Sequence, residues 1–330
     1  MAEPHCGHVV ASIGVTLSRR LHPHAQSGVA AVPYCRAVTR RRRAADYAYF
    51  DNAGLPLAFA HRGGASSQEA LRFENSMAAF EVAVGLGYRY LETDAHVTRD
   101  GTLLAFHDRT LERTTDHTGV VSELTYDELR QARIAGVHPI PLLHELLSSW
   151  PDVRLNIDAK SSAAVRPLAK LIAEHRAWDR VCVASFSARR LHELRQELGP
   201  RVASSYGRVG VGVLRFAPLA SLRRLLLSGG AAAAQVPAAF LPVQRSAAYA
   251  PPSDPEPNPA ARRRDPLSVE IVTADFIERA HELGKQVHVW TVDVPEEVNR
   301  LLDLGVDGIM ADRIDVLRQV YLSRDIWRTD

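Results

Sequence analysis

Two acidic residues and a histidine lie close together in the stretch Tyr90–Asp108 and have the chemical types of a reactive site. Apolar and polar residues alternate at its start, which predicts a strand that places Glu92 and Asp94 on the same face. Two neighbouring carboxylates repel each other unless positive charge neutralises them, and a divalent cation with oxygen ligands, Mg²⁺ or Ca²⁺, can do so. A second apolar run delivers His107, which indicates a general acid or base beside the metal. A half-buried strand with an acidic edge would explain the carboxylate pair alone equally well.

The same kinds of residue recur at the ends of other short apolar runs. They include a histidine, an arginine, a lysine, further carboxylates and a tryptophan. If the runs are parallel strands of one barrel, these ends meet at one rim. Independent surface residues would not explain why so many reactive side chains fall at the same rim. The residues are His61, Arg62, Glu74, Asp158, Lys160 and Trp290.

Short apolar runs alternate with helix-like stretches from Leu57 onward. Eight β-then-α units over about 260 residues predict an α/β fold, a TIM (β/α)₈ barrel. A doubly wound open sheet is the alternative, but it would need a glycine-rich phosphate loop, and His61–Gly64 lacks that spacing. The expected strands are Leu57–Ala60, Tyr90–Asp94, Val153–Asp158, Val181–Phe186, Val202–Tyr206, Ala233–Val236, Val287–Val292 and Gly308–Ala311.

The barrel domain is expected to span residues 49–330, with two stretches longer than the basic repeat. Residues 109–141 should form a small insertion after the second strand, with a short helix that ends at Gly136. Residues 245–267 are rich in proline, alanine and arginine and should form a flexible exposed loop. Residues 1–48 carry seven arginines against two acidic residues and are expected to form a disordered basic arm.

Composition argues against several classes of function. A net charge of +2 gives no general electrostatic support for nucleic-acid binding. The three cysteines show no paired spacing, so neither a disulfide framework nor a zinc site is expected. No apolar stretch reaches the roughly 18 residues of a membrane span and no signal peptide is recognised, which favours a cytoplasmic protein. The basic arm could make a peripheral contact with an anionic membrane, although a run of four arginines is more often simply solvated.

Phosphodiester hydrolysis suits these residue types. A phosphodiester is an anion with a poor alkoxide leaving group, so it needs positive charge, which a metal, Arg62 and Lys160 can supply. It also needs a base and an acid, and His61 and His107 titrate in the right range. Metal-assisted carbonyl chemistry, with the lysine as base or Schiff-base partner, is compatible with composition but would not require both histidines.

Six motifs follow one another between Leu57 and Leu317. They are AHRGG (60–64), FENSMAAF (73–80), LETDAHVTRDG (91–101), FHDRTLERTT (106–115), VHVWTVD (287–293) and GVDGIMAD (305–312). Each motif alone is weak, but the ordered set is specific. It resembles the glycerophosphodiester phosphodiesterase family.

This resemblance implies a TIM barrel with a small insertion after the second strand. It also implies hydrolysis of small glycerophosphodiesters to an alcohol and sn-glycerol 3-phosphate with a divalent cation, Mg²⁺ or Ca²⁺. The nucleophile would be water or the 2-hydroxyl of the substrate. The implied roles are acid–base catalysis for His61 and His107, metal binding for Glu92, Asp94, Asp158 and Glu74, and substrate binding for Arg62, Lys160 and Trp290.

The third-strand motif departs from the family, which usually has a glutamate where this chain has Asp158. The aspartate keeps the carboxylate but shortens its reach by roughly 1.5 Å, which puts the metal preference in question. This departure and the basic arm motivate one alternative, a barrel that binds phosphodiesters or membranes without turnover. A second alternative is a phospholipase D-like enzyme on intact lipids, which would need an exposed apolar rim.

Overall fold

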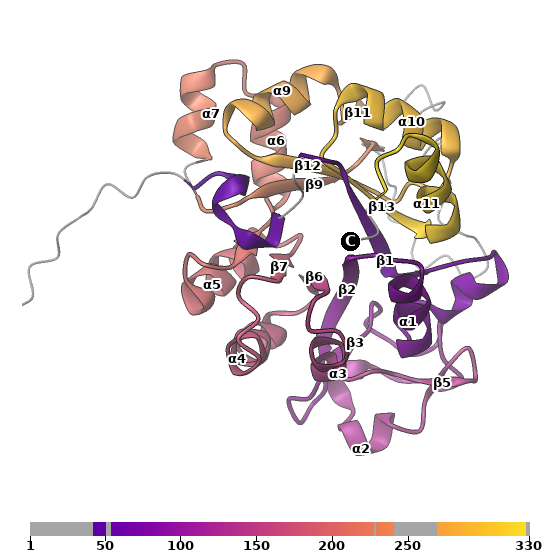
Figure 1. Ribbon diagram of the computed structural model, residues 1–330. Helices are drawn as coiled ribbons and strands as arrows, with labels where there is room; N and C mark the ends of the chain where they lie inside the picture. The colour runs from indigo at the N-terminus through magenta and orange to yellow at the C-terminus, as the bar shows by residue number, and fades with distance from the viewer. Residues whose placement is uncertain (1–41, 51–53, 228, 241–268, 328–330) are drawn as a thin grey trace, which may run out of the picture. The chain divides into compact units, whose positions relative to one another are not determined.

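Eight parallel strands form a barrel in the computed structural model, which describes residues 42–50, 54–227, 229–240 and 269–327. The strands neighbour one another in the order β8, β7, β6, β2, β1, β13, β12, β9, and a parallel bridge from Ser205 to Ala233 joins the two ends of this series. Figure 1 shows these strands around a centre with the helices outside them. The TIM (β/α)₈ barrel predicted from the sequence is therefore confirmed.

All eight expected strands are present. Parallel strands inside a barrel are buried on both faces, which is why they read as short apolar runs in the sequence. β6 is buried at all but its first residue. The bounds are β1 Leu57–Ala65, β2 Tyr90–Val97, β6 Arg154–Ala159, β7 Val181–Ala184, β8 Ala203–Ser204, β9 Ala233–Pro237, β12 Gln286–Trp290 and β13 Gly308–Arg313.

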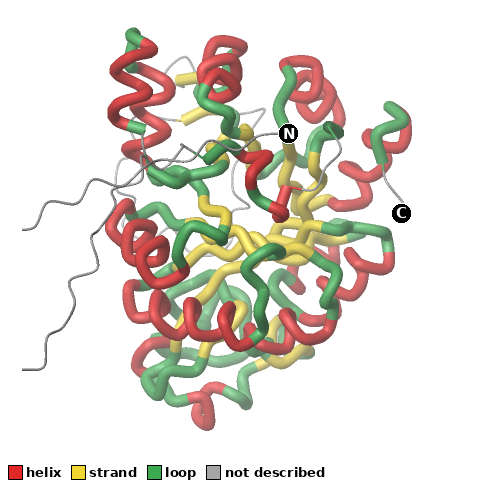
Figure 2. The backbone as a smooth tube through the Cα atoms, turned by 60° about the vertical axis from the view of Figure 1, so that its left-hand side comes forward, coloured by secondary structure: helices red, strands yellow, loops and turns green. Residues whose placement is uncertain are grey.

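Helices cover the outside of the strands (Figure 2). Their ends follow local signals: Ser76 Oγ accepts a hydrogen bond from the Ala79 amide, Pro295 opens α10, and Gly305 ends it with a left-handed φ of 88°. The bounds are α1 Met77–Gly85, α3 Leu143–Ser149, α4 Val165–Glu174, α5 Ala188–Leu198, α6 Arg208–Phe216, α7 Ala220–Leu226, α9 Ala274–Glu282, α10 Pro295–Leu304 and α11 Ile314–Ser323, with short 3₁₀ turns η3 Glu69–Phe73 and η5 Ser162–Ala164.

The stretch after β2 forms a small lobe of its own. Its side chains make a separate apolar cluster that includes Leu111, Leu129 and Ile134. The expected helix is shorter than predicted, because it ends at Leu129, and the following Ala135-Gly136 pair takes positive φ and turns the chain into a hairpin. The elements are β3 Leu103–Ala105, η4 Val121–Glu123, α2 Tyr126–Leu129, β4 Arg133–Ile134 and β5 His138–Pro139. A further antiparallel pair joins β10 Ala239–Phe240 to β11 Val269–Glu270.

Residues 42–50 pack against the end of the barrel where the strands begin, so the predicted arm boundary at residue 48 is wrong. Two 3₁₀ turns, η1 Ala44–Asp46 and η2 Ala48–Phe50, bury three aromatic rings there. Tyr90 Oη, at the start of β2, donates a 2.8 Å hydrogen bond to the Tyr49 carbonyl. The aromatic residues bury enough apolar surface to hold this segment in place. The rest of the arm, and the loop expected at 245–267, lie outside the described residues.

Two smaller expectations concern single features. Cys182 is fully buried in the barrel, as expected for a cysteine that acts as a small apolar residue. Among the described residues, no helix has both the length and the apolar character needed to cross a membrane.

We expect Tyr49→Ala to lower the free energy of unfolding by about 3–5 kcal/mol, because the ring is buried against Phe50 and Tyr90 and its loss leaves a cavity. Urea unfolding measures the change. Tyr49→Phe is the matched control: within the described structure the buried hydroxyl has no hydrogen-bond partner, so its removal should cost little. An Ala variant as stable as the wild type would show that this segment does not support the barrel.

Candidate active site

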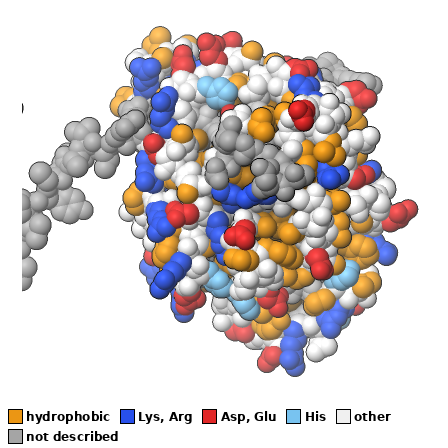
Figure 3. Space-filling model, in the orientation of Figure 1, with side chains coloured by type: hydrophobic (Ala, Val, Ile, Leu, Met, Phe, Trp, Pro, Cys, Tyr) orange, Lys and Arg blue, Asp and Glu red, His pale blue; other side chains and the backbone are white. Residues whose placement is uncertain are grey.

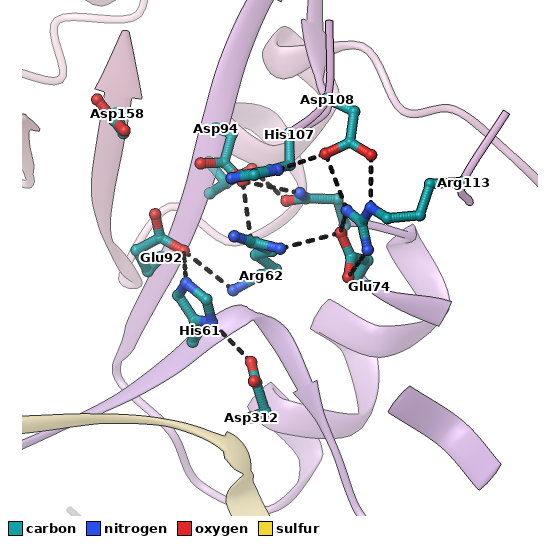
Figure 4. A network of polar contacts seen from close by, with 12 residues as sticks. His61, Arg62, Glu74, Glu92, Asp94, His107, Asp108, Arg113, Asp158 and Asp312 are labelled. Atoms are coloured by element: carbon teal, nitrogen blue, oxygen red, sulfur yellow. Dashed lines mark hydrogen bonds and ion pairs between the residues drawn. The ribbon is translucent and has the colours of Figure 1, made fainter. Parts of the chain in front are cut away.

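Charged side chains gather where the barrel strands end. They come from the ends of β1, β2, β6 and β13, from the segment after β3 and from the turn between η3 and α1 (Figure 4). This is the end of a (β/α)₈ barrel that carries reactive groups. The sequence-predicted residues His61, Arg62, Glu74, Glu92, Asp94, His107, Asp158 and Lys160 all lie in this region.

A distorted end of β1 turns His61 and Arg62 into this region. The pairing of β1 with β13 shifts between Ala60 and Ala65, and Arg62 takes a positive φ of 51°, which is unusual for a side-chain-bearing residue. Gly64 must be a glycine, because its φ is also positive and a Cβ there would lie 2.2 Å from a methyl group of Ile314. The motif therefore shapes the backbone that presents the two functional side chains.

His61 is held by a carboxylate from the last barrel strand. Its Nδ1 lies 2.6 Å from Asp312 Oδ1, and its Nε2 lies 3.7 Å from Glu92 Oε2. Burial alone would lower the pKa of His61, but the charges of Asp312 and Glu92 outweigh it and raise the pKa to about 9. Sequence reasoning missed Asp312, although it ends the GVDGIMAD motif at the carboxyl end of a predicted strand.

His107 has a matching arrangement on the other side of Arg62 (Figure 4). Its Nδ1 lies 2.6 Å from Asp108 Oδ1, and Asp108 in turn accepts hydrogen bonds from Arg113. Burial opposes ionisation of Asp108, but its bonds with His107 and Arg113 hold the pKa of that carboxyl well below its usual range. His96 donates from Nε2 to the His107 carbonyl at 3.0 Å and so fixes the backbone there.

Asp94 is the most enclosed acid of the site. Its Oδ1 lies 2.7 Å from Lys160 Nζ, and its Oδ2 lies 3.3 Å from Arg62 Nε and accepts a 3.1 Å hydrogen bond from the Asn75 amide. Burial would raise the pKa of Asp94, but Lys160 and Arg62 hold it well below its usual range. Lys160 also contacts Asp158 at 2.7 Å, since Asp94 and Asp158 are paired neighbours on β2 and β6.

Glu92 and Glu74 have different surroundings. Glu92 is buried and accepts a 3.1 Å hydrogen bond from the backbone amide of Arg62, and burial followed by the charge of Asp94 raises its pKa to about 7. Glu74 faces two arginines instead: Arg62 donates to it at 3.1 Å, and Arg113 bonds both of its oxygens. Of these two acids, Glu92 is the one with no ion pair to an arginine or lysine among the described contacts, and its ion-pair neighbour is His61, at 3.7 Å.

The cations and carboxylates form one alternating chain across the site. Each cationic side chain bridges two carboxylates. The order is Asp158, Lys160, Asp94, Arg62, Glu74, Arg113, Asp108 and then His107.

Trp290 lies apart from this chain, at the rim. Its ring meets the ring of Phe186 edge to face with centroids 5.8 Å apart, and Phe186 in turn lies 5.9 Å from Lys160 Nζ. The aromatic pair therefore borders the charged site next to Lys160. Ser185 donates to the Ala159 carbonyl at 2.9 Å, which ties the end of β7 to β6.

Carboxylates outnumber cations in this site. Even if both histidines are counted as cations, the six acids outnumber the five cationic side chains Arg62, Arg113, Lys160, His61 and His107. The acids are Glu74, Glu92, Asp94, Asp108, Asp158 and Asp312. Such a site repels an anion unless further positive charge is added. Across the described ranges, no three His, Cys, Asp or Glu side chains already surround one point as metal ligands. The donor chemistry nevertheless suits a hard divalent cation: the acids supply oxygen ligands, and the buried Asp158 Oδ1 has no hydrogen-bond partner within the described structure.

The fold and this site define a TIM barrel that carries two histidine–carboxylate pairs at the strand ends. The family model described as "Glycerophosphoryl diester phosphodiesterase family" matches residues 61–316. The chain belongs to this family and is a phosphodiesterase, a hydrolase. The recognition made from the six motifs is confirmed.

Individual relatives agree with this assignment. The chain is 36% identical over 274 residues to a probable glycerophosphodiester phosphodiesterase 2 of Mycobacterium tuberculosis, covering 83% of this chain and 94% of that protein. It is 26% identical to a human lysophospholipase D, covering 78% and 83% of the two chains. Among solved structures, an Oleispira antarctica phosphodiesterase in complex with the product sn-glycerol-3-phosphate has a TM-score of 0.60 at 20% identity, covering 81% of this chain and 97% of that one. That likeness supports the fold.

We expect Asp312→Asn to lower kcat by about 10²–10⁴ while leaving the fold intact, because the neutral amide no longer orients the His61 ring or stabilises its charged form. Steady-state kinetics measure the change. Asp315→Asn is the control, because Asp315 pairs with Arg313 and makes no contact with His61 among the described interactions. Equal kcat values for Asp312→Asn and the wild type would show that Asp312 does not contribute to turnover.

Proposed function

We propose that the chain hydrolyses glycerophosphodiesters to an alcohol and sn-glycerol 3-phosphate, with His61 and His107 as the acid–base pair and a divalent cation as cofactor. The observation that carries the proposal is the symmetry of the two histidines. Each has its Nδ1 2.6 Å from a carboxylate, and they lie on either side of Arg62 (Figure 4). An imidazole bound through Nδ1 keeps Nε2 to exchange a proton with a substrate.

The two histidines divide the proton transfers between them. One takes a proton from the nucleophile, which is water or the glycerol 2-hydroxyl of the substrate, and the other gives a proton to the departing alcohol oxygen. With the 2-hydroxyl as nucleophile, the first step forms a cyclic phosphate that water then opens. Asp312 and Asp108 fix the tautomer of each ring in either route, because each accepts the Nδ1 proton.

Glu92, Asp94 and Asp158 would hold the cation, Mg²⁺ or Ca²⁺. When bound, it supplies positive charge to the phosphate oxygens, which the acidic site lacks. Glu92 suits this role because no arginine or lysine is ion-paired with it among the described contacts, and Asp158 because one of its oxygens is buried without a partner within the described structure. Glu74 would join them only by exchanging its bonds to Arg113 for the ion. The shorter Asp158 side chain is the feature that would alter the choice of ion.

Arg62 and Lys160 would bind the phosphate, and Trp290 would line the glycerol side of the pocket. Arg62 and Lys160 share Asp94 in the structure, so a cation that takes part of the Asp94 charge leaves both more positive toward the substrate. Two relatives named as glycerophosphodiester phosphodiesterases and the product complex of the Oleispira enzyme support this substrate class. The cytoplasmic location and the absence of nucleic-acid partners stay predictions.

Turnover of lipids that keep an acyl chain is a second candidate function. The human relative is named a lysophospholipase D, and the exposed Phe186 ring stands at the rim beside Trp290. An apolar residue at the mouth gives an acyl chain a surface to contact. Parallel assays with glycerophosphocholine and lysophosphatidylcholine, compared by kcat/KM, decide between the two substrate classes.

We expect His61→Ala and His107→Ala each to lower kcat by ~10² or more with the fold preserved, because each removes one proton-transfer group. Release of sn-glycerol 3-phosphate from glycerophosphocholine measures kcat, and circular dichroism checks the fold. His144→Ala, an exposed histidine on α3, is the control and should leave kcat unchanged. A variant at either site histidine with wild-type turnover would exclude that histidine from the mechanism.

We expect EDTA to abolish product release from glycerophosphocholine and Mg²⁺ or Ca²⁺ to restore it, because the site otherwise repels the phosphate anion. Asp158→Glu restores the longer side chain and should change the ratio of activities with the two ions, whereas Asp152→Glu, an exposed acid before β6, should not. Full turnover in EDTA would contradict the role of the cation.

A further inference from the structure

Exposed apolar side chains are concentrated on one pair of helices. Of the ten large hydrophobic residues that are exposed in the described structure, six fall within the 18 residues 209–226, on α6, on α7 and in the short link between them. They include Phe216 at 62% and Leu225 at 68% exposure. We call this set the α6–α7 patch: Val209, Phe216, Leu219, Leu222, Leu225 and Leu226.

Helix α7 has its apolar stripe on the outside. Leu222, Leu225 and Leu226 follow the i, i+3, i+4 spacing of one helix face, and all three are exposed. Arg223, by contrast, is buried: it donates to the carbonyls of Ala217 and Pro218 and pairs with Glu282 at 3.2 Å. A helix of a water-facing surface would normally bury the leucines and expose the arginine. This face of α7 is therefore built to meet an apolar partner.

The charged side chains on α6, on α7 and in the link between them are all positive, and Glu282 of α9, which pairs with Arg223, is an acid beside α7. From residue 198 to residue 253 the sequence contains no aspartate or glutamate. Arg208 and Arg224 are exposed, and Arg215 lies over the ring of Phe216 at 5.2 Å. Figure 3 shows basic side chains among hydrophobic ones at the upper left, where Figure 1 places α7. Apolar side chains on two helices whose own charges are all basic suit the interface of a membrane that contains anionic lipids.

The patch is continuous with the rim of the active site. Arg208, the first residue of α6, lies 5.2 Å over the ring of Phe186. The same ring contacts Trp290 and lies 5.9 Å from Lys160 Nζ. A surface that rests on the patch therefore lies beside the mouth of the barrel.

We propose that the α6–α7 patch docks the enzyme on the surface of membranes with anionic lipids. Charge argues against a second copy of this chain, because a two-fold contact would set the arginines of both copies against each other. Charge also does not favour residues 241–268 as the segment that covers the patch. They contain four arginines and three acids, so they carry no net negative charge to attract the arginines of α6 and α7. Anionic headgroups satisfy the arginines, and the leucines enter the acyl boundary.

Co-sedimentation of the full chain with lipid vesicles tests the proposal. The wild type should bind vesicles of equal parts phosphatidylglycerol and phosphatidylcholine more tightly than phosphatidylcholine alone, and about 1 M NaCl should weaken the binding. The variant L222S/L225S/L226S should lower the partition coefficient by roughly tenfold or more. Its turnover of a water-soluble substrate and its circular dichroism should match the wild type, which separates loss of docking from loss of folding or catalysis.

The matched control is V82S/V137S/L322S, which changes three exposed apolar residues outside the patch and should bind as the wild type does. The proposal is overturned if the wild type binds neither vesicle, or if the leucine variant binds as tightly as the wild type, as it would if the basic N-terminal residues alone held the lipid. A dimer in light scattering that the leucine substitutions dissociate would equally overturn it, because the patch would then be a contact between copies of the chain.

Discussion

Every charged contact at the barrel mouth is constrained by an excess of carboxylates over cations. Lys160, Arg62 and Arg113 each form ion pairs with two acids, so none of them neutralises a single residue alone. Buried charges are stable only when they are paired, so the arrangement ties the ends of β2 and β6, the turn between η3 and α1 and the start of the insertion into one unit. Loss of any one cation would leave two acids short of charge.

The barrel explains why these residues come together from distant parts of the chain. Its β1 end contributes His61 and Arg62 through a backbone distortion that only glycines at the next positions permit. The segment between β3 and the insertion contributes His107, whose backbone is fixed by His96. The fold thus supplies two histidines with equivalent carboxylate partners from unrelated segments.

Most of the barrel and most of the site follow from the sequence, for identifiable reasons. Buried parallel strands read as apolar runs, so all eight could be located, and the alternating acids of β2 could be placed on one face. The prediction that the helix extends to Gly136 was wrong, because Ala135 and Gly136 take positive φ and turn the chain. The pattern of apolar residues does not reveal such a turn. The sequence did not predict the packing of residues 42–50, because the neighbouring arginines favoured an exposed arm. The aromatic residues Tyr47, Tyr49 and Phe50 were the feature that indicated a buried segment. Asp312 was missed because its pairing with His61 is a tertiary contact, and the available signal was its position at the carboxyl end of a predicted strand.

The His61–Asp312 contact joins residues 251 positions apart, and it connects the first barrel strand to the last. During synthesis on the ribosome, His61 leaves the exit tunnel long before its partner has been translated. The histidine acquires its orientation only when β13 docks beside β1 and the barrel closes. A nascent or truncated chain that lacks β13 therefore lacks the carboxylate partner of His61. The complete site forms only when the whole barrel has folded.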